Sequence, residues 1–133
     1  MQKEETDLRR RTKNFALEIV RMFSTVPKTT EAQVLGKQAL RSGTSVGANY
    51  REAYRARSKP EFIAKCGDSL RELEETAYWL ELFVGANIVA PEKVSALRKD
   101  RDRTDRYFCY NSEALQGNPL ILNFYFLIFS RHS

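Results

Sequence analysis

Apolar residues recur every three or four positions along most of the chain, which is the spacing of a helix that buries one face. This pattern predicts four helices, over residues 8–26, 31–57, 59–84 and 91–98. The third helix has the most regular apolar seam, which consists of Ile63, Cys66, Leu70, Leu73, Ala77, Leu80 and Val84. Because short connections place consecutive helices side by side in opposite directions, we expect an all-α fold, an antiparallel up-and-down four-helix bundle.

The predicted helices have recognisable ends. Pro27 terminates the first helix, because a proline rarely continues one. Thr29 or Thr30 then caps the second helix. Ser58 and Glu61 have the spacing of a capping box at the start of the third.

The second helix contains an unusual stretch, residues 38–53, in which Gly43 and Gly47 interrupt the helical pattern. Each interior glycine costs a helix roughly 0.5–1 kcal/mol relative to alanine, so packing on one face must outweigh the weak local propensity. No strand precedes the glycines, which argues against a phosphate-binding loop. We therefore interpret the stretch as a surface that another backbone approaches closely, and we expect Ser45 and Asn49 to form hydrogen bonds across the bundle.

The composition limits the class of protein. At 133 residues the chain fits one domain, 1–133, whose residues 1–7 we expect to be disordered. No run of about 20 apolar residues predicts a membrane span, and no apolar signal segment follows the first residues. Two cysteines, Cys66 and Cys109, make neither a disulfide framework nor a metal site. We therefore expect a cytoplasmic protein with no cofactor and no membrane partner.

The net charge of +5 is unevenly distributed. Residues 1–60 carry 13 Lys/Arg and 6 Asp/Glu, residues 61–99 carry 5 and 7, and residues 100–133 carry 4 and 4. The basic excess therefore lies in the first two predicted helices, where it favours contact with phosphate groups or with an acidic partner. Ordinary solvation of a small domain is the alternative interpretation.

The last third of the chain departs from the helical pattern. Residues 100–106 are charged without an apolar stripe, and no helical period follows them. We hypothesise a frameshift, because codons exist for Asp100 to Asn111 that read from the second base as Thr-Glu-Thr-Glu-Leu-Thr-Ala-Ile-Phe-Val-Thr, an amphipathic continuation. The fourth helix is therefore predicted to be truncated or altered after residue 99, with 100–133 an atypical, out-of-frame tail. Intact in-frame DNA on resequencing would exclude the hypothesis.

Two segments together resemble the signature of the bacterial 23S rRNA-intervening sequence proteins, a family of four-helix bundles. The first is Leu35-Gly36-Lys37-Gln38 followed by Arg41 to Ala53, and the second includes Ser58-Lys59, Phe62-Ile63, Lys65, Glu72, Glu75-Thr76 and Tyr78-Trp79-Leu80-Glu81. The resemblance covers roughly residues 8–99. Members are similar to the accessory protein of diversity-generating retroelements. The resemblance therefore implies a homopentamer of four-helix subunits with a basic surface for nucleic acid, and it carries no enzymatic activity.

The basic residues of the first two predicted helices are candidate contacts for RNA or DNA. They are Arg9, Arg10, Arg11, Lys13, Lys37, Arg41, Arg51, Arg55 and Arg57. The signature residues to which we assign structural roles are Ser42, Gly43, Ser45, Gly47, Asn49, Glu52, Glu72, Glu75, Tyr78 and Trp79. The alternative function is a protein-interaction scaffold, an accessory subunit that docks a nucleic-acid enzyme such as a reverse transcriptase.

Catalysis has little support from the residue types. The single histidine, His132, is penultimate, so no histidine-based pair or triad is available. Cys66 lies on the apolar seam, where a small core residue is the simplest interpretation. Glu52, Glu72 and Glu75 lack the Glu-x-x-His pairs of a metal site in a bundle, and we expect them to pair with arginine or to lie at a subunit contact. We therefore predict that the protein is not an enzyme and binds no metal.

Overall fold

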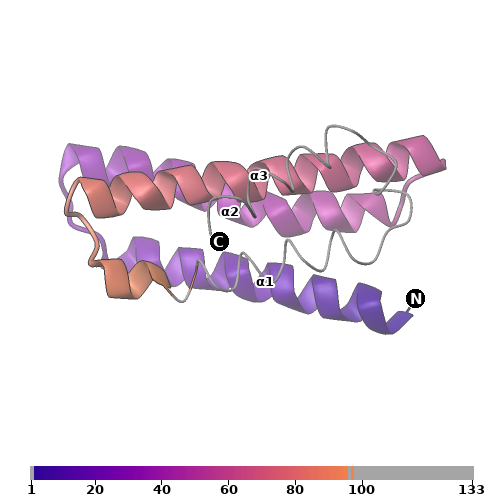
Figure 1. The fold of residues 1–133 in the computed structure, drawn as a ribbon, viewed down its shortest axis with the longest axis horizontal. Helices are drawn as coiled ribbons and strands as arrows, with labels where there is room; N and C mark the ends of the chain where they lie inside the picture. Colours follow the sequence, from indigo (N-terminus) through magenta and orange to yellow (C-terminus); the bar gives the residue numbers. More distant parts are fainter. Residues whose placement is uncertain (1, 96, 98–133) are drawn as a thin grey trace, which may run out of the picture.

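Three long helices make up most of the described structure (Figure 1). The computed structural model describes the backbone of residues 2–95 and of residue 97, and the side chains from residue 8 onward within that range. The helices are α1 (Gln2–Thr25), α2 (Thr30–Ala53) and α3 (Lys59–Gly85). Short connections join them, and each helix runs back alongside the one before it. No described helix combines the length and the apolar character of a membrane span.

Side-chain caps begin α2 and α3 where the sequence predicted them. Thr29 Oγ1 accepts a hydrogen bond from the N–H of Ala32 at 3.3 Å, which identifies Thr29 as the cap of α2. Ser58 Oγ accepts a hydrogen bond from the N–H of Glu61 at 3.2 Å. The Glu61 carboxylate in turn accepts one from the N–H of Arg57 at 2.9 Å, one residue earlier than in a standard capping box.

Two helix boundaries differ from the prediction. α2 ends at Ala53 rather than at residue 57, because the N–H groups of Arg55 and Ala56 bond to carbonyls three residues back, each at 3.0 Å, and this tighter turn closes the helix. α1 begins at Gln2, so residues 2–7 are helical where we expected disorder. The first residues, Gln-Lys-Glu-Glu, are of types with high helix propensity, which accounts for the earlier start.

α2 is the central helix, since it packs against both α1 and α3. Within the described chain no comparable contact joins α1 directly to α3, as is expected of the diagonal helices in a four-helix bundle. Residues 91–95 are helical again, and Val94 and Leu97, exposed by 0% and 3%, join the buried core. The rest of the predicted fourth helix, and the tail 100–133 with its frameshift hypothesis, lie outside the described residues. The complete four-helix up-and-down arrangement therefore stays a prediction.

The α1–α2 contact explains the glycines of α2. A Cβ atom at Gly43 would lie 2.9 Å from Ile19 Cγ1, and one at Gly47 would lie 3.1 Å from Thr12 Oγ1. The predicted close packing is therefore confirmed. The nearest atoms of α1 at Gly43 belong to the Ile19 side chain, and at Gly47 the backbone carbonyl carbon of Thr12 also comes near, at 3.7 Å from the added Cβ.

Candidate nucleic-acid interface

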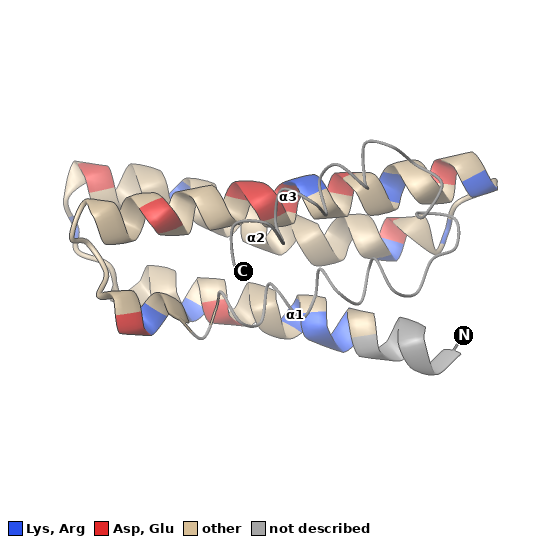
Figure 2. Cartoon of the chain, in the orientation of Figure 1, with Lys and Arg blue, Asp and Glu red and all other residues tan. Residues whose placement is uncertain are grey.

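The nine candidate phosphate contacts occupy α1, α2 and the turn that follows α2. Four lie in the N-terminal half of α1, three on α2, and two in the turn after it. All are exposed except Arg11, which is half-buried. Figure 2 shows Lys and Arg gathered on the described N-terminal part of α1, whereas the middle of α3 carries acidic residues. The basic excess therefore lies on the α1–α2 side of the molecule.

An open groove of about 450 Å³ runs between α1 and α2, and it contains three of the nine basic residues. These are Lys13 on α1, Arg51 on α2 and Arg55 in the closing turn. The other lining residues are mostly small, and they are Thr12, Ala16, Thr44, Gly47, Ala48 and Glu52. Gly47 therefore serves twice, because its missing side chain admits Thr12 of α1 and also keeps the groove open.

The charge balance of the groove favours an anion. Within the described chain, Lys13, Arg51 and Arg55 form no ion pair with a carboxylate. The acidic lining residue, Glu52, forms an ion pair with a cation outside the groove, because its Oε2 lies 2.7 Å from Nζ of Lys65 on α3. We did not predict this groove from the sequence. The feature that could have indicated it is the run of small residues between Arg41 and Arg51 on α2.

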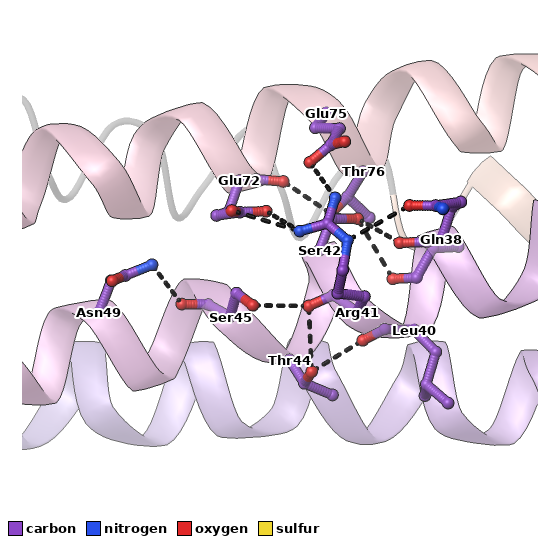
Figure 3. Close-up of polar contacts among 11 residues, drawn as sticks. Gln38, Leu40, Arg41, Ser42, Thr44, Ser45, Asn49, Glu72, Glu75 and Thr76 are labelled. Atoms are coloured by element: carbon purple, nitrogen blue, oxygen red, sulfur yellow. Dashed lines mark hydrogen bonds and ion pairs between the residues drawn. The ribbon is translucent and has the colours of Figure 1, made fainter.

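Arg41 does not belong to the groove, because its guanidinium is held by carboxylates of α3 (Figure 3). Its Nη2 lies 2.5 Å from Glu75 Oε2, its Nη1 lies 3.3 Å from Glu72 Oε2, and its Nε donates to Gln38 Oε1 at 3.2 Å. The hydrogen bond to Glu75 is the largest of the effects that raise the pKa of Arg41. These contacts match the expected pairing of Glu72 and Glu75 with arginine, and they hold the Arg41 guanidinium against α3.

The two carboxylates of this cluster are not equivalent. The pKa of Glu72 is raised above its usual value, mainly because burial disfavours its charged form and then because it shares a hydrogen bond with Glu75. The attraction to Arg41 acts in the opposite direction and does not outweigh these effects. Glu75 lies closer to Arg41, so we take Glu75 as the main ion-pair partner. Glu72 is the carboxylate whose ionisation is disfavoured by the fold, mainly because of its burial.

Small polar side chains join α2 to α3 inside the bundle (Figure 3). Ser42 Oγ and Thr76 Oγ1 lie 2.8 Å apart, and both residues are fully buried. Ser69 Oγ donates to the Val46 carbonyl at 2.6 Å. Sequence reasoning missed the roles of Ser69 and Thr76, although their spacing of seven residues places them on one face of α3 beside the apolar seam.

The expected cross-bundle hydrogen bonds of Ser45 and Asn49 are absent from the described contacts, and that prediction was wrong. Ser45 Oγ donates to the Arg41 carbonyl at 2.7 Å, and Asn49 Nδ2 donates to the Ser45 carbonyl at 3.0 Å. Both bonds lie within α2, because a short polar side chain reaches the carbonyl one turn back more easily than it reaches a second helix.

The remaining signature residues and the thiol show no reactive arrangement. Tyr78 is 53% exposed and packs against Trp79, whose ring nitrogen has no hydrogen-bond partner among the described residues. Cys66 is buried, and loss of solvation raises the pKa of its thiol to about 12. A thiol with that pKa stays protonated at neutral pH, as expected of a core residue. The described residues contain no cluster of three or more His, Cys, Asp or Glu side chains that could hold a metal ion.

Comparison with known proteins identifies the family. Residues 4–108 match the family described as 23S rRNA-intervening sequence protein. The chain belongs to this family. A crystal structure of a protein with unknown function from the S23 ribosomal protein family of Bacteroides thetaiotaomicron is similar to this chain, with a TM-score of 0.73 and 34% sequence identity over 77% of this chain and 95% of that chain. A comparison with curated proteins found no match.

Proposed function

We propose that this member of the 23S rRNA-intervening sequence protein family binds the phosphate backbone of RNA or DNA in the α1–α2 groove and catalyses no reaction. The observation that carries the proposal is the convergence of Lys13, Arg51 and Arg55 on one open groove, without a carboxylate partner in the described chain. Cations placed in this way release condensed counterions when they bind phosphates, and this release drives association. The family name, which refers to 23S rRNA, supports an RNA-related role.

The lining of the groove favours contact with backbone rather than with bases. Sites for single strands stack bases on aromatic side chains, and no aromatic residue lines the described groove. The small side chains in its lining leave room for a phosphate backbone to approach. Phosphate contacts position a nucleic acid without reading its sequence, so we expect binding that is weakly sequence-specific.

The test is the salt dependence of binding to a short RNA hairpin and to a DNA duplex. A triple variant, Lys13→Gln, Arg51→Gln and Arg55→Gln, removes three phosphate contacts. We expect the slope of log affinity against log salt to fall by about 2–3 and the affinity at low salt to fall at least about tenfold.

The matched control removes three charges at the opposite end of the bundle, with Arg21→Gln, Lys28→Gln and Lys93→Gln. These residues are exposed and do not line the groove. We expect the control to change the slope by less than about 1. Equal losses in the two triple variants would exclude the groove as the site, and absence of binding by the parent protein at low salt would favour the interaction scaffold.

We also propose that the chain forms a homo-oligomer, with five copies as the family resemblance implies. Val34 on α2 and Tyr78 on α3 are 56% and 53% exposed, and exposed apolar and aromatic side chains are suited to subunit contacts. Oligomerisation would repeat the groove and raise avidity for a long nucleic acid. Light scattering of the purified protein tests this: one species of five chains supports the pentamer, and a monomer contradicts it.

A further inference from the structure

Glu52 lines the α1–α2 groove, yet its carboxylate pairs with Lys65, a residue that lies outside the groove. Its Oε2 lies 2.7 Å from Nζ of Lys65, which belongs to α3 and does not line the groove. The side chain of Glu52 is 57% exposed, so burial does not fix its direction. The contact with Lys65 therefore decides on which side of α2 this negative charge lies.

Arg55 is the alternative partner for Glu52. It follows Glu52 by three residues in the closing turn of α2, where the N–H of Arg55 bonds to the Glu52 carbonyl at 3.0 Å. Side chains three residues apart on a helical turn lie within reach of each other. Lys65 and Arg55 thus compete for one carboxylate, and in the structure Lys65 holds it.

The other acidic neighbours of Lys65 have partners of their own. Asp68 pairs with Arg71, and Glu61 accepts a hydrogen bond from the N–H of Arg57. Glu52 is the carboxylate that Lys65 contacts directly among the described residues. This contact raises the pKa of Lys65, first through the hydrogen bond and then through charge attraction, so Lys65 is charged at neutral pH.

We propose that Lys65 is a positioning residue for the groove: it holds the Glu52 carboxylate on the α3 side and so leaves Arg55 free to bind phosphate. This inference rests on the proposed function of the groove. Lys65 itself contacts no nucleic acid. A unit charge about 6 Å from a bound phosphate changes its affinity by about three- to tenfold at an effective dielectric constant of roughly 40–80.

The test is a double-mutant cycle on binding of the RNA hairpin at low salt, with Lys65→Met, Glu52→Gln and the double variant. We expect Lys65→Met to weaken binding about three- to tenfold, because the released carboxylate turns toward Arg55. In the Glu52→Gln background the same Lys65→Met change should have little effect, since no carboxylate remains to be released. An equal loss in both backgrounds would overturn the proposal, because Lys65 would then act by direct contact or by its charge at a distance.

Two controls separate positioning from folding and from overall charge. Lys65→Arg keeps a cation opposite Glu52, so this variant should bind RNA as the parent does. Lys59→Met removes a charge elsewhere on α3. It should cause a small loss of RNA affinity that is the same in the Glu52 and Glu52→Gln backgrounds. Urea unfolding midpoints of all variants show whether each is folded at the binding temperature.

A second probe distinguishes failure of this inference from failure of the proposed function. If the parent does not bind RNA or DNA, the cycle is repeated with inorganic tripolyphosphate. The same dependence on Glu52 would support the positioning role of Lys65 while nucleic-acid binding is rejected. Absence of tripolyphosphate binding, or binding without that dependence, would overturn both.

Discussion

The contact between α1 and α2 depends on the absence of a side chain at Gly43. A Cβ atom there would lie 2.9 Å from Ile19, and Ile19 is fully buried, so it has little room to move aside. Two effects oppose each other at this position. Alanine favours a helix over glycine by about 0.5–1 kcal/mol, whereas overpacking a core costs about 1–3 kcal/mol. Packing therefore dominates, and the helix tolerates a poor helix former to keep the contact.

We expect Gly43→Ala to lower the free energy of unfolding by about 1–2 kcal/mol, as measured by urea denaturation. Gly85→Ala is the matched control, because nothing lies within 4 Å of a Cβ at that position and its backbone has no positive φ. The control should leave stability unchanged or raise it by up to about 1 kcal/mol. A Gly43→Ala variant as stable as the parent would show that α1 can shift to accept the methyl group.

Polar contacts join the elements α2 and α3 both inside the bundle and at its surface. Inside, Ser42 and Thr76 meet through their hydroxyl groups, and at the surface Arg41 bridges Glu72 and Glu75. The raised pKa of Glu72 means that the folded protein keeps this proton to a higher pH than the unfolded chain does. The protonated Glu72 therefore stabilises the fold fully when the pH is below 4.5, the pKa of this side chain in the unfolded chain. This stabilisation is lost as the pH rises through the higher pKa of the folded protein.

We therefore expect Glu72→Gln to flatten the decline in the free energy of unfolding as the pH rises from 4.5, because the variant has no proton to lose at this position.

Glu75→Gln should instead lower the free energy of unfolding at pH 7, by up to about 1 kcal/mol, since it removes the closest ion pair of Arg41. Denaturant unfolding across this pH range provides the measurement. Glu81→Gln, an exposed position on the same helix, is the control and should match the parent. If Glu72→Gln keeps the slope of the parent, Glu72 is not the group responsible.

The whole molecule is organised around α2, with α1 and α3 on either side of it and the helical residues 91–95 following α3. Because α1 and α3 make little direct contact within the described chain, their facing surfaces need a further element to cover them. Val94 and Leu97 begin to supply it, since both are buried in the common core. The carboxylates of Glu72 and Glu75 on α3 are paired with Arg41, whereas the cations of the α1–α2 groove have no carboxylate partner among the described residues.

We expect Val94→Ala to lower the free energy of unfolding by about 2 kcal/mol, because it removes buried methyl groups and leaves a cavity in the core. Glu92→Ala changes an exposed residue of the same short helix and should have an effect within about 0.5 kcal/mol. Urea denaturation of both variants tests whether residues 91–95 are an integral part of the fold. Similar values for the two would show that this segment is not packed against the core in solution.

Local patterns in the chain were enough to predict three long helices, the caps of α2 and α3, and the family, although the start of α1 and the end of α2 were wrong. Apolar periodicity and the hydrogen bonds of Thr29 and Ser58 act within a few residues, so they can be predicted without knowledge of the rest of the fold. The glycine stretch likewise predicted a close contact, because small side chains on one face of a helix allow a neighbouring helix to pack closely against it.

Which side chains meet across the bundle depended on the packed helices. Packing placed Lys13 in one groove with Arg51 and Arg55, directed Arg41 toward Glu75, and paired the carboxylate of Glu52 with Lys65. Periodicity shows which residues share one face of a helix, but it fixes neither the rotation of one helix against another nor their axial offset. Those two quantities come from the packing of ridges into grooves across the whole interface, and the candidate phosphate site depends on them.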